Sequence, residues 1–212
     1  MKYTAWLIGG LVLFAFVLAG FLYPRMPLEM ASHWNIQGEV DGYLPRFWGV
    51  FLLPLVLVVI FLLFLLIPKI DPLKENLQKF RRYFDLFILF LVGFLLYLYL
   101  LTILWNLGWR FQLTKALVPA FGLLYYFCGL LLEKAEPNWF VGIRTPWTLS
   151  DQTVWQKTHQ LGARLFKMIA LLALGGFFWP RLAFYFLLVP LFLVVLFLLV
   201  YSYLAYSKRS QE

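Results

Sequence analysis

The chain has 212 residues, of which 63% are hydrophobic and 13% are charged, and its formal net charge is +8. Soluble domains carry about 45–50% apolar and about 25% charged residues, so this composition excludes an ordinary soluble domain and indicates an integral membrane protein. The single cysteine, Cys128, excludes an intrachain disulfide and a thiolate metal cluster.

Six apolar runs have the length, or nearly the length, needed to cross about 30 Å of hydrocarbon as helices. Their residues do not alternate between apolar and polar, as the strands of a membrane barrel do. The sequence therefore predicts an all-α integral membrane protein with six transmembrane helices. The predicted spans are residues 4–23, 47–67, 83–107, 116–132, 165–179 and 183–206.

The distribution of lysine and arginine predicts the orientation. Thirteen of the 18 fall at the amino terminus, in the second and fourth loops, and in the carboxyl-terminal tail. Short loops rich in these residues stay in the cytoplasm. We therefore expect a multi-pass protein of the cell (inner) membrane with both termini cytoplasmic. Topology and attraction to anionic lipid account for the positive charge, so no direct nucleic-acid partner is expected.

The loops divide the chain into three segments. Residues 1–67 hold the first two spans and an outer loop. Residues 68–132 hold a basic inner loop and spans three and four, and residues 133–212 hold an inner motif loop and spans five and six. In the basic loop, Leu73, Leu77 and Phe80 recur at helical spacing among lysines and arginines, which predicts an amphipathic stub lying in the lipid headgroup layer.

The outer loop contains HWNIQGEVDGY, whose Asp-Gly pair favours a tight turn. Glu29 and His33 are four residues apart, so a short helical turn would place both on one face. Zinc takes three or four protein ligands, which this pair does not supply. We expect no cofactor, with zinc held by Glu29, His33 or His159 as the alternative, and a folded cap built on His33, Trp34, Asn35 and Asp41.

The inner motif loop begins NWFVGIRTPWTLSD and continues QTVWQKTHQLG. Thr148 and Asp151 fit a capping box, which predicts a helix that begins near Leu149 and runs into span five. Arg144 offers a planar fork that suits a carboxylate or a phosphate. The alternative is a loop folded on itself, with Arg144 paired to Glu133, Glu136 or Asp151.

Enzyme signatures are missing from the sequence, which contains no HExxH, no P-loop and no GxSxG. We therefore expect no catalytic residues. Two alternatives remain open: a metal-dependent membrane hydrolase that uses Glu29, His33 or His159, and a small transporter with Asn106 or Asp85 on its path.

The motifs HWNIQGEVDGY, IPKIDPLKEN and NWFVGIRTPWTLSDQTVWQKTH occur in an order that resembles the SdpI family of membrane proteins. The resemblance implies a membrane immunity and signalling protein that meets a secreted peptide toxin on its outer face and recruits a cytoplasmic repressor. The outer binding candidates it implies are His33, Trp34, Asn35, Gly38, Asp41 and Gly42. The inner ones are Asn138, Gly142, Arg144, Thr145, Trp147, Thr148, Trp155 and His159.

Overall fold

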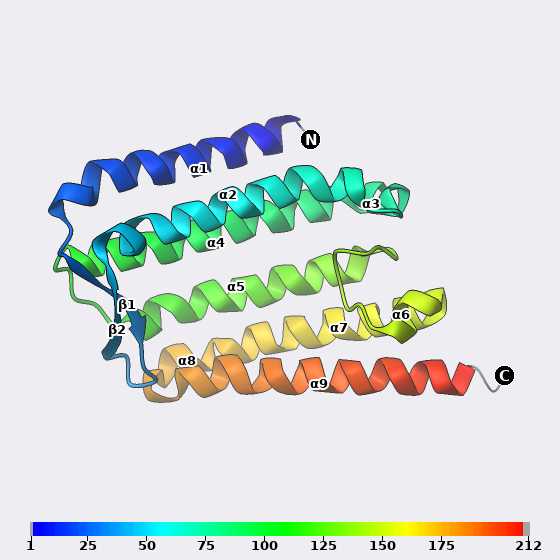
Figure 1. Ribbon diagram of the computed structural model, residues 1–212. Helices are drawn as coiled ribbons and strands as arrows, with labels where there is room; N and C mark the ends of the chain where they lie inside the picture. The colour runs from blue at the N-terminus through cyan, green and yellow to red at the C-terminus, as the bar shows by residue number, and fades with distance from the viewer. Residues whose placement is uncertain (1, 210–212) are drawn as a thin grey trace. The chain divides into compact units, whose positions relative to one another are not determined.

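The computed structural model describes residues 2–209 and is mostly helical, with one two-stranded antiparallel sheet (Figure 1). The elements in chain order are α1 (Lys2–Leu22), η1 (Tyr23–Arg25), β1 (Glu29–Trp34), β2 (Val40–Pro45), α2 (Arg46–Ile70), α3 (Lys74–Lys79), α4 (Arg81–Asn106), α5 (Leu113–Lys134), α6 (Pro146–Ser150), α7 (Gln152–Ala173), α8 (Gly175–Phe178), η2 (Pro180–Leu182) and α9 (Ala183–Arg209).

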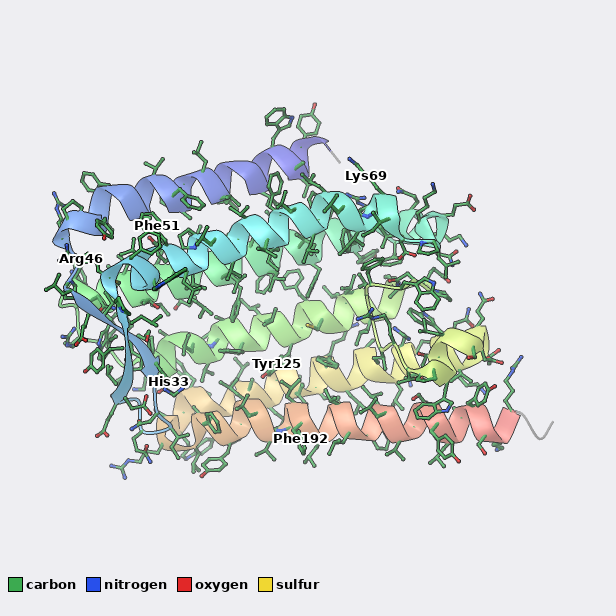
Figure 2. All side chains as sticks on the ribbon, viewed as in Figure 1. His33, Arg46, Phe51, Lys69, Tyr125 and Phe192 are labelled. Carbon is green, nitrogen blue, oxygen red and sulfur yellow. The ribbon has the colours of Figure 1, made fainter. Side chains whose placement is uncertain are left out.

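Six helical stretches within the described residues are long and apolar enough to cross a membrane. They are Tyr3–Arg25, Arg46–Ile70, Arg81–Asn106, Leu113–Lys134, Gln152–Phe178 and Pro180–Arg209. Large apolar side chains stay exposed along them: Leu171 is 72% exposed, and Phe192, which is labelled in Figure 2, is 64% exposed. Exposure of so much apolar surface to water is unfavourable, whereas contact of the same surface with lipid chains is not. The six predicted spans are confirmed as long apolar helices, which indicate a multi-pass membrane protein.

The fifth of these stretches begins at Gln152 rather than at residue 165. The prediction that a helix runs from the polar loop into span five is confirmed from Gln152 to Ala173, where α7 is continuous. The predicted start near Leu149 is wrong, because Leu149 lies in α6 and the extended residue Asp151 separates α6 from α7. Its first half is polar in sequence and still has buried residues, among them Val154 and Thr158. Hydropathy alone therefore placed the start of this helix too late.

The chain divides into two compact units, Met1–Leu65 with Ile88–Leu117 and Leu66–Phe87 with Val118–Glu212. In the first, Met30 of β1 is fully buried against α2, where a Cβ on Gly49 would lie 2.7 Å from the Met30 sulfur. The side chain of Asn106, at the end of α4, accepts from the Ala31 N–H at 2.8 Å and donates to the Ala31 carbonyl at 3.0 Å. The hairpin is thus fixed to both α2 and α4.

The second unit is held by close packing of α5, α7 and α9, and Figure 1 shows α7 alongside α9. Gly122 and Gly129 on α5 face α7; a Cβ on them would lie 3.2 Å from the Ala170 carbonyl oxygen and 2.9 Å from that of Ala163. Small residues allow helix backbones to approach in lipid, where the hydrophobic effect does not drive helices together. The core cluster comprises Val118, Tyr125, Ile169, Ala170, Ala173, Ala183, Leu187, Val194 and Leu198.

The hairpin is the main departure from the predicted all-α fold. Residues 29–34 form a strand, so Glu29 and His33 do not lie on a helical turn. The turn forms at Asn35–Gly38, where the Gly38 N–H donates to the Asn35 carbonyl at 2.9 Å and Gly38 has a φ of +82°. The Asp41-Gly42 pair, expected to make the turn, lies inside β2 instead.

Replacement of Gly129 tests the α5–α7 packing. We expect Gly129→Ala to destabilise the protein by about 1–3 kcal/mol, because the new methyl group overpacks a contact between helix backbones. Gly93→Ala is the matched control: Gly93 lies in α4 with no atom within 4 Å of a built Cβ. Thermal unfolding in detergent should show a lower midpoint for Gly129→Ala and an unchanged or higher one for Gly93→Ala. Equal midpoints would contradict the packing argument.

Candidate functional site

Each compact unit carries one candidate site. The first unit contains the hairpin, residues 29–45, with the predicted outer candidates. The second contains residues 135–151, here called the motif loop, together with the start of α7. The side chains of the motif loop are the more deeply buried.

Asn138 organises the motif loop and is completely buried. Its side-chain nitrogen donates to the carbonyls of Glu136 at 2.8 Å and Val141 at 2.9 Å. Its side-chain oxygen accepts from the N–H groups of Phe140 at 2.9 Å and Val141 at 2.6 Å. All four hydrogen bonds available to an asparagine amide are therefore made within the loop.

Trp155 and His159 lie one turn apart on α7, and their rings stack at 3.9 Å with an interplanar angle of 17°. The Trp155 Nε1–H donates to the Ala135 carbonyl at 2.8 Å. His159 accepts from the Ile143 N–H at Nε2, at 3.0 Å, and its Nδ1 lies 2.9 Å from the Trp155 carbonyl. A ring that accepts at Nε2 carries its proton on Nδ1, so both nitrogens are used in holding the loop.

Gly142 lets the motif loop approach His159. Its φ is +114°, a left-handed conformation that side chains other than glycine rarely adopt. A Cβ at this position would lie 2.4 Å from His159 Nε2. The loop therefore needs glycine here both for its backbone conformation and for space.

Thr145 and Thr148 start the short helix α6 and form a reciprocal capping box. Thr148 Oγ1 accepts from the Thr145 N–H at 2.9 Å, and Thr145 Oγ1 accepts from the Thr148 N–H at 3.1 Å. Thr145 also bonds Ser202 of α9 at 3.2 Å. The predicted capping box at Thr148–Asp151 is thus wrong by three residues, since Thr145 is the residue that caps α6.

Asp151 caps the next helix, α7. Its Oδ1 accepts from the N–H groups of Thr153 and Val154 at 2.7 and 2.9 Å, and its Oδ2 lies 2.5 Å from Arg209 Nε. The hydrogen bond from Val154, followed by that from Thr153 and the charge of Arg209, holds the pKa of this carboxyl below its usual range. Asp151 therefore stabilises the start of α7 as a carboxylate.

Arg144 is exposed and donates to the Trp139 carbonyl rather than to a carboxylate. Of its predicted partners, Glu133 pairs with Lys134 and Lys167, and Asp151 pairs with Arg209. The motif loop is folded on itself as the alternative interpretation expected, but through main-chain oxygens. Trp147 contacts the Tyr203 ring edge-on at 5.2 Å.

Asp71 and Asn76 also hold the motif loop, and the sequence interpretation did not include them among the site residues. Asp71 is buried and accepts from the Leu73 N–H at 2.7 Å and the Trp139 N–H at 3.2 Å. Asn76 donates to the Pro137 carbonyl at 2.9 Å. The motif IPKIDPLKEN contains both residues and was the signal that could have identified them.

The apolar residues of the predicted amphipathic stub are placed differently from the expectation. Leu77 and Phe80 are buried within the protein, at 0% and 2% exposure, while Leu73 is 39% exposed. The helix that forms, α3, spans Lys74–Lys79. Leu77 and Phe80 therefore contribute to the protein core rather than to the headgroup layer.

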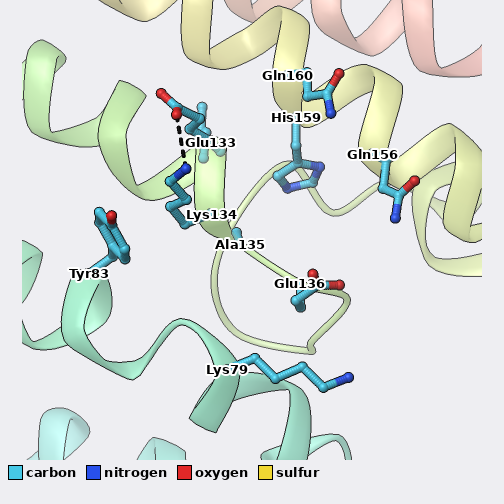
Figure 3. Close-up of a pocket in the computed structure, with 10 residues that line it drawn as sticks. Lys79, Tyr83, Glu133, Lys134, Ala135, Glu136, Gln156, His159 and Gln160 are labelled. Carbon is cyan, nitrogen blue, oxygen red and sulfur yellow. Dashed lines mark ion pairs between the residues drawn. The ribbon is translucent and has the colours of Figure 1, made fainter.

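A polar cavity of about 390 Å³ adjoins the motif loop (Figure 3). Its lining comes from Lys79 and Tyr83, from residues 132–136 at the end of α5, and from Gln156, His159 and Gln160 of α7. Gln156 and Gln160 are exposed, and neither side-chain amide makes a hydrogen bond among the described residues. These two amides are available to a ligand, as are the Glu136 carboxylate and the Tyr83 hydroxyl, which also line the cavity and have no hydrogen-bond partner among the described residues.

The hairpin presents its candidates on an exposed surface. His33 Nδ1 lies 2.5 Å from Asp41 Oδ1, and both side chains are largely exposed. Asn35 accepts at its side-chain oxygen from the N–H groups of Gln37 and Glu39, both at 3.0 Å, which shapes the turn.

Trp34 and Gly42, two other candidates in the hairpin, are held in place by packing against neighbouring side chains. The Trp34 ring packs edge-on against Trp105 at 5.7 Å. Gly42 lies directly against His33, because a Cβ there would be 2.8 Å from the His33 Cβ. Across residues 2–209 no three histidine, cysteine or acidic side chains gather where they could hold a metal ion, and Glu29, His33 and His159 are not brought together.

Removal of the Asn138 amide tests its role in the motif loop. We expect Asn138→Ala to cost about 1–3 kcal/mol or more, because buried main-chain groups lose their partners. Asn35→Ala is the matched control, since Asn35 makes similar bonds at an exposed turn where water replaces them. Unfolding in detergent should show a clearly larger loss for Asn138→Ala. A larger loss for Asn35→Ala would contradict this account.

Comparison with known proteins places these sites in matched segments. The model of the SdpI/YfhL protein family matches residues 134–202, which include the motif loop, and a domain of unknown function, DUF1648, matches residues 10–58, which include the hairpin. Immunity protein SdpI of Bacillus subtilis (strain 168) is 26% identical over 199 residues, 93% of this chain and 93% of that protein. No solved structure matches the chain. The chain belongs to the SdpI/YfhL protein family and is a distant homologue of that immunity protein.

Proposed function

We propose that this protein is a membrane immunity and signalling protein of the SdpI type. It protects the cell membrane against a secreted peptide toxin that it meets on the outer face, and it recruits a cytoplasmic repressor. The observation that carries the proposal is the end-to-end similarity to an immunity protein, which covers 93% of both chains. Because the similarity covers the hairpin as well as the motif loop, the activity proposed is that of the whole chain.

The hairpin suits the role of toxin-binding site. In the topology expected from the lysine and arginine distribution it follows the first span and faces outward. Its side chains His33, Asp41 and Tyr43 are exposed, while Met30 anchors it beneath. An exposed surface on a fixed support binds a partner with little ordering cost.

The motif loop suits the role of a cytoplasmic contact surface. Its interior is rigidly bonded through Asn138 and His159, so these residues shape the surface rather than bind the partner. Groups available to bind a partner include the exposed Arg144 and the side-chain amides of Gln156 and Gln160, which have no hydrogen-bond partner among the described residues. Arg144 supplies the planar donor fork that recognises a carboxylate.

Protection is tested by expression of the chain in bacteria that lack an immunity protein of their own. The cells are exposed to secreted peptides encoded beside the gene of this chain and, in parallel, to the toxin against which the B. subtilis relative acts. We expect survival to rise with the matching peptide. The B. subtilis protein is the positive control, and Gly129→Ala reports the effect of impaired folding. Unchanged killing by every peptide, with the protein present in the membrane, would refute immunity.

Recruitment of the repressor is tested with the double variant Gln156→Ala and Gln160→Ala. We expect about tenfold weaker retention of the adjacently encoded repressor at the membrane, because two hydrogen bonds are lost, while protection remains. Gln152→Ala is the control, since Gln152 is also an exposed glutamine on α7 but does not line the cavity. Unaltered retention by the double variant would show that the repressor does not bind through these amides.

A further inference from the structure

The outer edge of β2 has free main-chain groups, and the hydrogen bonds of β1 identify them. Antiparallel pairs alternate between hydrogen-bonded and non-hydrogen-bonded pairs. The Arg46 N–H donates to the Leu28 carbonyl at 2.8 Å, and Tyr43 lies opposite Ala31 three positions along the ladder. The alternation makes Ala31–Tyr43 a non-hydrogen-bonded pair, in which both residues direct their N–H and C=O away from each other.

The contacts of Ala31 support this assignment independently. Both of its main-chain groups bond the side chain of Asn106, on the side of β1 away from β2. Asn106 therefore pairs the edge of β1 at Ala31. Tyr43 correspondingly directs its N–H and C=O outward from β2, where neither has a partner among the described residues. The edge of β1 is thus paired at Ala31, whereas among the described residues the edge of β2 is open at Tyr43.

Pro45 is consistent with the same geometry. It pairs with Glu29 at the next outward-facing position of β2. Proline has no N–H, so it fits a strand only where the N–H would point away from the ladder. An outward-facing position of this strand therefore already accommodates proline, which makes Tyr43→Pro a usable probe of the edge.

The charge of the hairpin selects the kind of partner. From Met26 to Pro45 there are three acidic residues, Glu29, Glu39 and Asp41, and no lysine or arginine, in a chain whose net charge is +8. The adjacent Arg46 is turned back, because its Nε donates to the Pro27 carbonyl and its guanidinium lies 5.6 Å over the Tyr23 ring. The open edge is thus flanked by negative charge.

We propose that the open edge of β2 binds an extended, positively charged segment of the secreted peptide as a third strand. Main-chain hydrogen bonds to Tyr43 supply affinity, and the acidic side chains select lysine and arginine at alternate positions of the peptide. A second copy of this chain fits less well, since two β2 strands paired edge to edge would bring like charges together. The inference rests on the proposed function, because it specifies how the toxin is bound.

The binding test uses the purified full chain in nanodiscs of neutral phosphatidylcholine, which remove attraction between cationic peptides and lipid. The probes are a blocked eight-residue peptide of alternating lysine and valine, its glutamate counterpart, and the lysine peptide N-methylated at every second residue. We expect the lysine peptide to bind and the glutamate peptide not to bind. We expect N-methylation on the bonding edge to weaken binding roughly tenfold, because donors are lost. Equal binding of methylated and unmethylated peptides would overturn the proposal.

Variants of the protein test the same edge. Tyr43→Pro removes the outward N–H, and we expect roughly tenfold weaker binding of the lysine peptide. Tyr43→Ala is the matched control that removes the side chain and keeps the N–H. Equal binding by Tyr43→Pro and Tyr43→Ala would refute the proposal, as would crosslinking that joins two copies through position 43. If Tyr43→Pro does not fold, the proposal is tested by comparing how the methylated and unmethylated lysine peptides bind to the unaltered protein.

Killing assays separate this inference from the proposed function. If the unaltered chain protects cells and Tyr43→Pro does not, both stand. If the chain protects and Tyr43→Pro protects equally, immunity stands and edge binding fails. If the chain gives no protection but binds the lysine peptide, and Tyr43→Pro weakens that binding, edge binding stands and immunity fails.

Discussion

The buried amide of Asn138 is the interaction on which the motif loop depends. A polar loop at the end of an apolar helix bundle must satisfy its main-chain groups internally, since each unpaired group costs several kcal/mol away from water. Asn138 bonds four of them, and Ile143 and Ala135 find partners in His159 and Trp155. Because two of these side chains come from α7, the loop and the helix are fixed together. The exposed Arg144 and glutamines are presented by this framework.

Helix packing in the second unit supports the same framework. Gly122 and Gly129 bring α5 close to the alanines of α7, and Thr145 reaches Ser202 of α9. Asp71 and Asn76 add bonds from the preceding loop. The loop around Asp71 and Asn76, the motif loop with α7, and α9 are distant in sequence. Together they form one surface beside a polar cavity. A protein that recruits a partner benefits from such rigidity, because little conformational entropy is lost on binding.

The hairpin differs from the motif loop in how its main-chain groups are paired. Its buried face is anchored by Met30 and its inner edge is paired to Asn106 at Ala31, while the main-chain groups of Tyr43 on its outer edge have no partner among the described residues. Proteins normally protect open strand edges, because they invite pairing. Here the acidic residues on the hairpin give that pairing a charge preference. The two sites thus differ in kind: one is complete in itself and the other is open to an added strand.

Several features could be predicted from single segments of the sequence. The six spans follow from runs of apolar residues, and the continuity of α7 follows from the spacing of Val154, Thr158 and Leu161. The hairpin could not be predicted in this way, because Asn35, not the Asp-Gly pair, forms its turn and because Met30 is buried by a helix that comes later in the chain. Asp71 was missed because its partner, Trp139, is 68 residues away.

The sequence by itself determined the membrane class, the six helices, the family and the identity of the motif residues. Those properties depend on local composition and on the order of motifs along the chain. Only the tertiary structure decided what the motif residues do: His159 accepts a main-chain hydrogen bond, Arg144 binds a carbonyl, and Tyr43 directs its amide outward. The reason is physical, since a side chain's role depends on which distant groups must be paired when water is excluded.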